Sequence, residues 1–338
     1  MRVHRSFRKL LAVTLVAATL CLPRLLAAGE RTISNPVAPS GQDPWVIQKD
    51  GAYYYCYSGG GAIWVNREKR LEDAVQPNGQ EVWRPEPGRP YSKELWAPEL
   101  HSFRGKWYIY FAADDGRNEN HRMYVLESAA GDPLGSYAIR GQLADPTNKW
   151  AIDGTVMSHR GAHYFIWSGW EGDTNVQQNL YIARMKGPTA LTGRRVLISR
   201  PEHPWEKVGR PLINEGPQAL VSRAGRIFII YSASGSWTDD YCLGQLTLVG
   251  DNPLDSRSWR MKDAPVFRRA DSVFGPGHAS FTRSPDGVQD WIVYHAAKHR
   301  GAEWNRNIRM QLFTWDGQSN PVFGSPVAEG IAIPAPSE

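Results

Sequence analysis

The chain has little cysteine: three residues in 338, of which only Cys56 and Cys242 lie beyond the first 28 positions. Two cysteines so far apart in sequence do not make the disulfide framework that holds small secreted domains together. No group of cysteine and histidine residues has the spacing of a zinc site. We therefore expect two buried thiols in different strands.

Helical periodicity and long hydrophobic runs are also missing. No long segment repeats its apolar residues with the helical period of about 3.6 residues, which argues against helical and βαβ architectures. The apolar run at residues 10–22 is too short to span a membrane. It follows a basic N-terminus and precedes small residues at Ala27 and Ala28, which is the pattern of a secretory signal peptide over residues 1–28. We expect a secreted or periplasmic protein that makes no membrane contact, with residues 29–338 as its folded domain.

Excess positive charge disappears once that segment is set aside. Residues 1–28 hold five of the 39 basic residues and none of the 34 acidic ones, so the remainder carries 34 of each. A chain without net charge gives no indication of a nucleic-acid partner.

Aromatic residues, glycine and proline are plentiful, with 14 Trp, 14 Tyr, 32 Gly and 24 Pro. Five segments share a glycine turn followed by a strand of aromatic and β-branched residues that ends in Ser, Ala or His. Their turn glycines are 54, 56, 64 and 62 residues apart. Five units of about four strands each predict an all-β fold, a five-bladed β-propeller. A β-sandwich would not produce a five-fold repeat. The segments are residues 50–58, 104–112, 160–168, 224–232 and 286–295.

Three carboxylates precede these turns at matching positions. Eight to ten residues before the glycines stand, in order, Asp43, Ala97, Asp153, Glu215 and His278. Equivalent positions of a propeller surround its central channel, so we expect these side chains to converge. Each acid could instead cap its own turn, but three acids at five equivalent positions favour a functional cluster.

The cluster fits hydrolysis of a glycosidic bond. That reaction needs one protonated carboxyl group to give a proton to the leaving oxygen, and one ionised carboxylate to activate water or attack directly. A third carboxylate can keep the pKa of the acid raised and hold it in place. This chemistry requires no cofactor, and its substrate is a carbohydrate.

Six short motifs in this order resemble glycoside hydrolase family 43, over essentially all of residues 29–338. The resemblance implies an inverting enzyme with Asp43 as general base, Asp153 as modulator of the acid's pKa and Glu215 as general acid. It also implies substrate binding by His278, beside which an ion such as calcium often lies, so His278 is a candidate metal ligand. Arg309 would reach the sugar in the −1 subsite. The motifs are Gln42-Asp43-Pro44, Trp96-Ala97-Pro98-Glu99, Ile152-Asp153-Gly154, Asn214-Glu215-Gly216-Pro217, Gly275-Pro276-Gly277-His278 and Asn307-Ile308-Arg309-Met310-Gln311.

The side chain of Trp96 is a candidate platform for a sugar, since the apolar face of a pentose stacks on an indole. Alternatively, it packs between blades, as aromatic residues of propellers often do.

Residues 96–101, 197–204 and 229–233 most resemble the α-L-arabinofuranosidase branch of the family, which includes exo-acting arabinan-trimming enzymes. We therefore expect removal of α-L-arabinofuranosyl units from arabinan, arabinoxylan or related oligosaccharides, by a monomer. A β-xylosidase and an endo-arabinanase are the nearest alternatives. A retaining hydrolase and a non-catalytic sugar-binding propeller remain open.

Overall fold

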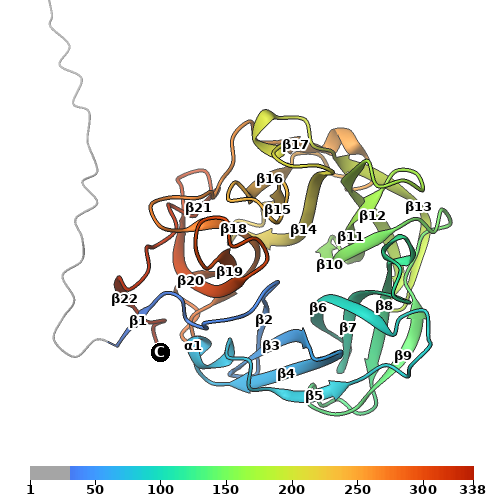
Figure 1. Ribbon diagram of the computed structural model, residues 1–338, viewed down its shortest axis with the longest axis horizontal. Coiled ribbons are helices and arrows are strands. Elements are labelled where there is room, and N and C mark those ends of the chain that lie inside the picture. Colours follow the sequence, from blue (N-terminus) through green and yellow to red (C-terminus); the bar gives the residue numbers. More distant parts are fainter. Residues whose placement is uncertain (1–30) are drawn as a thin grey trace, which may run out of the picture.

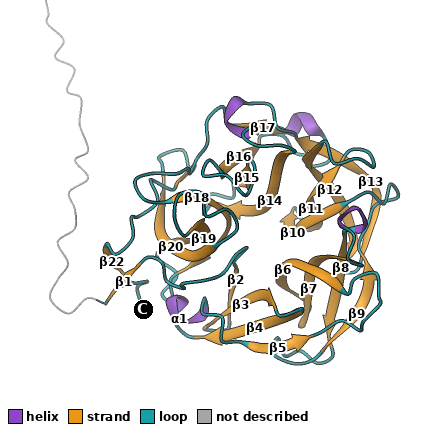
Figure 2. Ribbon diagram, viewed as in Figure 1, coloured by secondary structure: helices purple, strands orange, loops and turns teal. Residues whose placement is uncertain are grey.

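The computed structural model describes residues 31–338, and these form an all-β protein, as expected. Short helical segments lie in the connections between strands (Figure 2). No helix in this part of the chain is long and apolar enough to cross a membrane. The predicted signal peptide, residues 1–28, lies outside the described residues. The helical segments are α1 (Leu71–Ala74), η1 (Asn118–Asn120), η2 (Pro204–Glu206) and η3 (Ser256–Ser258).

Three sheets of four strands and one of eight lie around a common centre (Figure 1). In each four-stranded sheet the strands follow chain order, and neighbours pair antiparallel. The first consists of β2 (Trp45–Lys49), β3 (Ala52–Gly59), β4 (Ala62–Glu68) and β5 (Gln80–Trp83). The second consists of β6 (Lys93–Phe103), β7 (Lys106–Asp114), β8 (Arg122–Ser128) and β9 (Tyr137–Gln142). The last consists of β18 (Phe274–Arg283), β19 (Asp290–Ala297), β20 (Arg306–Trp315) and β21 (Pro321–Val322).

The eight-stranded sheet contains two further groups of the same kind. They are joined only where β12 runs parallel to β14, at Gln177 and Gln178 opposite Leu212 and Ile213. The first group is β10 (Ala151–His159), β11 (Ala162–Trp170), β12 (Gln177–Gly187) and β13 (Ala190–Ser199). The second is β14 (Leu212–Val221), β15 (Ile227–Ala233), β16 (Cys242–Leu248) and β17 (Trp259–Met261).

The two ends of the described chain meet beside the first and last sheets (Figure 1). Strand β1 (Thr32–Ser34) pairs antiparallel with β22 (Ala332–Pro334). Ala38 forms a bridge with Ile308 of β20, in which the Ile308 amide donates to the Ala38 carbonyl at 3.0 Å. The N-terminal segment is therefore hydrogen-bonded to the last sheet before it enters the first.

The core lies between the faces of neighbouring sheets. Cys56 of β3 belongs to a cluster with Ile109 and Phe111 of β7, whereas Cys242 of β16 belongs to one with Ile166 of β11. Both cysteines are buried and unpaired, as expected. The second strand of each repeat is buried on both faces, because its aromatic and β-branched residues fill the space on either side. These packed strands give the first strands, which lie nearest the centre in Figure 1, a rigid support.

Each first strand from β6 onward carries a β-bulge near the centre. The register shifts after Trp96, Ile152, Glu215 and Gly277. Within the bulges, Ala97, Asp153, Gly216 and His278 have φ angles of 42°, 55°, 53° and 44°, and Asp43 before β2 has 48°. This left-handed conformation is most accessible to Gly and is enriched in Asp and His. Bulges redirect side chains, so the backbone aims these residues at the centre.

The bulges correct one detail of the expected ring of residues. Gly216, not Glu215, is the counterpart of Asp153 and His278, and Glu215 stands one position earlier, level with Trp96 and Ile152. The turn glycine follows Glu215 by ten residues but His278 by nine, a difference equal to the offset of one residue. Glu215 therefore enters the centre from a different register than the two aspartates.

Candidate active site

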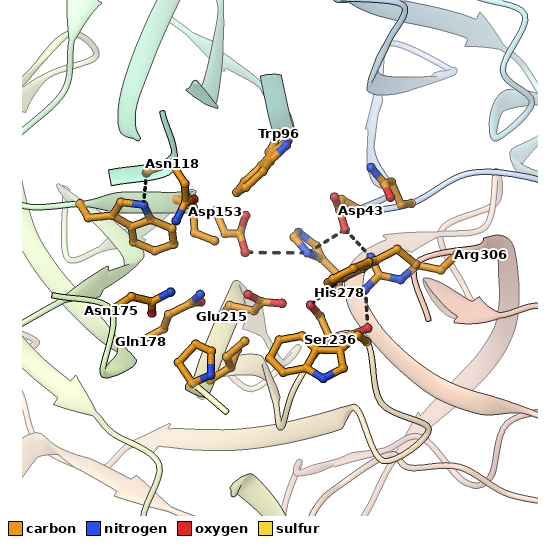
Figure 3. A pocket seen from close by; sticks show the side chains of 17 residues that line it. Asp43, Trp96, Asn118, Asp153, Asn175, Gln178, Glu215, Ser236, His278 and Arg306 are labelled. Atoms are coloured by element: carbon orange, nitrogen blue, oxygen red, sulfur yellow. Dashed lines mark hydrogen bonds and ion pairs between the residues drawn. The ribbon is translucent and has the colours of Figure 1, made fainter. Parts of the chain in front are cut away.

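The three predicted carboxylates lie together at the centre of the molecule. Asp43, Asp153 and Glu215 line one cavity of about 620 Å³, together with His278 and Trp96. Figure 3 shows the carboxylates directed toward a common space, with His278 between the two aspartates. Residues 62 to 172 positions apart in sequence thus share one pocket.

The Asp43 carboxylate is surrounded by nitrogen atoms. Its Oδ1 lies 3.1 Å from His278 Nδ1, 3.3 Å from His295 Nδ1 and 3.7 Å from an Arg306 guanidinium nitrogen. Burial alone would raise the pKa of Asp43, but the charge and the hydrogen bond of His278 outweigh it and hold this pKa well below its usual value. Asp43 is therefore ionised at neutral pH.

His278 acts as the cation of the cluster. Burial opposes its charge, but Asp43 and Asp153, whose Oδ2 lies 3.9 Å from Nδ1, raise the pKa of His278 to about 9. The ring is therefore protonated at neutral pH. Its backbone amide donates to Ser232 Oγ at 2.8 Å, which fixes the strand beneath it.

The described residues around His278 do not form a metal site from side chains alone. Calcium takes about six to eight oxygen ligands, and no group of three or more His, Cys, Asp or Glu residues within 31–338 could hold a metal.

Asp153 and Glu215 are held in a drier environment than Asp43. Burial raises the pKa of both carboxyl groups, and for Asp153 the charges of Glu215 and Asp43 add to the effect. Asp153 Oδ2 accepts the Gly216 amide at 3.1 Å, and Glu215 Oε1 accepts the Tyr241 hydroxyl at 2.8 Å. The pocket thus contains an ionised carboxylate and two carboxyl groups that retain protons more readily.

Glycines make room for the tyrosine that holds Glu215. A Cβ atom on Gly277 would lie 2.3 Å from the ring of Tyr241, far closer than two carbon atoms can approach. Gly277 therefore leaves the space that the Tyr241 ring occupies. Any side chain at Gly277 would push the tyrosine away from Glu215.

Three side chains at the ends of the repeated strands connect neighbouring sheets at the site. Ser168 Oγ donates to the Asn214 carbonyl at 2.9 Å, beside Glu215. Ser232 Oγ accepts from His278, and His295 Nδ1 accepts the Asp43 amide at 3.0 Å. Each of these three side chains therefore hydrogen-bonds to the backbone that carries a site residue in the next group of strands.

The side chain of Trp96 faces the pocket and packs within its own sheet. It lines the cavity, and it stacks on His121 with ring centroids 4.0 Å apart and planes at 26°. Trp150 also lines the cavity and stacks on Trp170 at 4.8 Å. These stacked pairs give one side of the pocket rigid aromatic surfaces.

The expectation for Arg309 is wrong. Arg309 is buried, does not line the cavity, and donates to Asn307 Oδ1 at 3.0 Å and to the Val327 carbonyl. Arg306 lines the cavity instead, near Asp43. Both arginines are on β20, and residues three apart in a strand face opposite ways, so only one of them can reach the pocket. Arg309 contacts none of the three acids; its ion pair, at 3.7 Å, is with Glu329.

Several residues of the site carry no clear signal in the sequence. His295 ends a recognised repeat, but its contact with Asp43 crosses from the last sheet to the first. Tyr241 and the wall residues Trp237 and Trp304 lie in connections of irregular length between strands. Only the folded chain brings these residues to the carboxylates.

Comparison with known proteins agrees with this geometry. Residues 33–319 match the sequence profile of Glycosyl hydrolases family 43. An "Extracellular exo-alpha-(1->5)-L-arabinofuranosidase" of Streptomyces avermitilis is 35% identical over 89% of this chain, which spans only 65% of that protein's length. A protein of the same name from Streptomyces chartreusis is 36% identical over 79% of this chain and 83% of its own. The crystal structure of an α-L-arabinofuranosidase from Lactobacillus brevis matches with a TM-score of 0.80 and 34% identity, covering 88% of this chain and 98% of that one.

Proposed function

The chain belongs to family 43 of the glycosyl hydrolases, and from this premise we propose that it is an exo-acting, inverting α-L-arabinofuranosidase. The names of the Streptomyces and Lactobacillus relatives support the sugar. The observation that carries the proposal is that Asp43, whose surroundings favour the charged form, and Glu215, whose burial favours the protonated form, meet in one pocket. The substrates would be arabinan or arabinose-containing polysaccharides and oligosaccharides.

The proposed reaction is a single displacement. Asp43 accepts a proton from a water molecule while the water oxygen forms a bond to the anomeric carbon. The glycosidic C–O bond breaks as Glu215 gives its proton to the leaving oxygen. The products are arabinose of inverted configuration and a shortened chain, with Asp43 protonated and Glu215 ionised, and proton exchange with solvent restores both. No cofactor enters this balance.

Asp153 and His278 set the charges for this step. Asp153, which accepts the Gly216 amide next to Glu215, would orient the acid and favour its protonated form, while protonated His278 keeps Asp43 ionised. Arg306 would donate hydrogen bonds to sugar hydroxyls in place of Arg309, and Trp96 would contact the sugar through its indole.

The proposed activity is tested with purified protein on α-1,5-arabino-oligosaccharides and on aryl α-L-arabinofuranosides. We expect release of arabinose, and proton NMR in the first minutes should show β-L-arabinofuranose, the inverted anomer. Initial release of the α-anomer would identify a retaining enzyme. Preference for a β-D-xyloside would indicate a β-xylosidase that uses the same mechanism. Internal cleavage of arabinan would indicate an endo-arabinanase. Sugar binding without turnover would favour the non-catalytic alternative.

The architecture and location are part of the proposal. We infer that the five four-stranded groups are the blades of one five-bladed propeller over residues 29–338. The five-fold repeat and the pairing of the N-terminal segment with the last sheet support this. Export directed by residues 1–28 is supported by the extracellular relatives. We propose that the enzyme acts as a monomer, since the residues of the site come from one chain.

Tyr241→Phe should move the basic limb of the kcat/KM profile to higher pH. Burial raises the pKa of Glu215, and the Tyr241 hydroxyl lowers it by stabilising the carboxylate. Activity falls as pH rises through this pKa, because Glu215 must be protonated. Loss of one hydrogen bond therefore shifts the limb upward by about 0.5–1 pH unit, measured from pH–rate profiles.

Tyr231→Phe is the matched control for this substitution. Tyr231 is a buried neighbour whose hydroxyl donates to Glu206 at 2.9 Å, outside the pocket. It should lower thermal stability and leave the basic limb in place. An unchanged limb in Tyr241→Phe would show that the hydroxyl does not act on the proton donor.

A further inference from the structure

Two tryptophans on separate connections form a second aromatic wall of the cavity. Trp237, between β15 and β16, and Trp304, between β19 and β20, both line it, with ring centroids 6.0 Å apart and planes at 57°. Trp304 is 56% exposed, and no other Trp, Tyr or Phe in residues 31–338 is an exposed residue. A large indole surface is thus presented to solvent at the edge of a pocket that contains three carboxylates.

This wall is held in place by contacts within the protein. Trp237 packs against Gly209 and Gly235, where an added Cβ atom would lie 3.1 Å and 2.8 Å from its ring. The Trp304 indole N–H donates to Ser236 Oγ at 3.2 Å, and Arg306 donates to the Ser236 carbonyl at 2.7 Å (Figure 3).

A hydrogen bond also joins the two connections directly. The Gly301 amide donates to Asp239 Oδ1 at 2.8 Å. Because these contacts already orient the rings, little side-chain entropy is lost when a ligand stacks on them.

The wall shares its supports with the proton donor. Ser232 of β15 lies opposite Glu215 in the strand register, and the connection that follows it carries Trp237. The same connection ends at Tyr241, which donates to Glu215. A proton donor must face the oxygen of the departing group, and the connection that positions this donor also carries Trp237.

We propose that Trp237 and Trp304 form a binding site for the leaving-group sugar, with its C–H face on the Trp304 indole. The ligand is a neutral furanosyl residue of an arabino-oligosaccharide. This inference rests on the proposed function. Stacking on an indole is worth about a tenfold change in affinity when the contact is well formed.

The test compares two substrates that differ only on the leaving side. Methyl α-L-arabinofuranoside has no sugar there, and α-1,5-arabinotriose has two. Trp304→Ala should lower kcat/KM for the trisaccharide by about tenfold and change that for the methyl glycoside by less than about twofold. Trp304→Phe should recover part of the loss, since a smaller aromatic face remains. Trp64→Ala, at a partly exposed tryptophan of β4 outside the cavity, should affect neither substrate.

Equal losses on both substrates would overturn the inference, because the substitution would then act on the reacting sugar or on the fold. An unchanged trisaccharide rate would overturn it as well, by showing that the indole contributes no binding. If the unsubstituted enzyme cleaves neither substrate, the proposed function fails first. The unsubstituted enzyme's own rates therefore separate the two failures.

Discussion

Glu215→Gln is expected to lower kcat on α-1,5-arabinotriose by roughly 1,000-fold, because the amide cannot supply a proton to the leaving oxygen. Glutamine keeps the length of the side chain and can still accept the Tyr241 hydroxyl through its carbonyl oxygen. The loss therefore measures proton donation rather than collapse of the pocket. Arabinose release under saturating substrate gives the value.

The leaving group decides whether this interpretation is right. A 2,4-dinitrophenolate departs without needing a proton. On 2,4-dinitrophenyl α-L-arabinofuranoside, the kcat of the same variant should therefore fall by only about tenfold or less. Equal losses on both substrates would argue that Glu215 acts on the sugar or on water instead. Glu127→Gln, on β8 and outside the cavity, is a suitable control, because its ion pairs with Lys106 and Arg140 lie away from the pocket.

The pH profile should change together with the rate. In the unsubstituted enzyme the basic limb of kcat/KM reports loss of the Glu215 proton, since burial raises the pKa of this group. Glutamine does not titrate in this range, so the limb should disappear in Glu215→Gln. If the basic limb stays in place, it reports the titration of another group, and the buried carboxyl of Asp153 is the first candidate.

The position of the carboxylates could be predicted from sequence because the fold repeats. Asp43 and Asp153 occupy equivalent points of a five-fold sequence repeat, and equivalent points of a repeated fold predict convergence. The bulge geometry reinforces the pattern, since Asp43, Asp153 and His278 share one backbone conformation. Glu215 departs from it by one residue, and only the strand register shows this offset.

The surroundings of the carboxylates could not be predicted in the same way. Arg306 and Arg309 are equivalent by residue type, and only the direction of each side chain from β20 tells which one faces the pocket. Tyr241, Trp237 and Trp304 come from connections whose lengths vary between repeats, so no period places them. His295 contacts Asp43 because the last sheet lies against the first, and no local segment of the sequence indicates this packing.

Asp43→Asn is expected to lower kcat on arabinotriose by about 10,000-fold, because an amide cannot accept the proton of the attacking water. Asparagine is the appropriate replacement, since residue 43 has φ of 48°, a conformation that asparagine tolerates and alanine does not favour. It can also accept hydrogen bonds from His278 through its carbonyl oxygen. The loss is therefore one of charge and basicity.

Azide provides the decisive measurement for this variant. A small anion that needs no deprotonation can enter the space of the water molecule, form the bond to the anomeric carbon and expel the leaving sugar, whose oxygen is protonated by Glu215. Added azide should therefore restore turnover and give β-L-arabinofuranosyl azide, which NMR and mass spectrometry identify. If azide gives neither rescue nor this product, Asp43 does not control attack on that face. Rescue in Asp43→Asn but not in Glu215→Gln on the same oligosaccharide would assign opposite sides of the reacting carbon to the two carboxyl groups, as a single displacement requires.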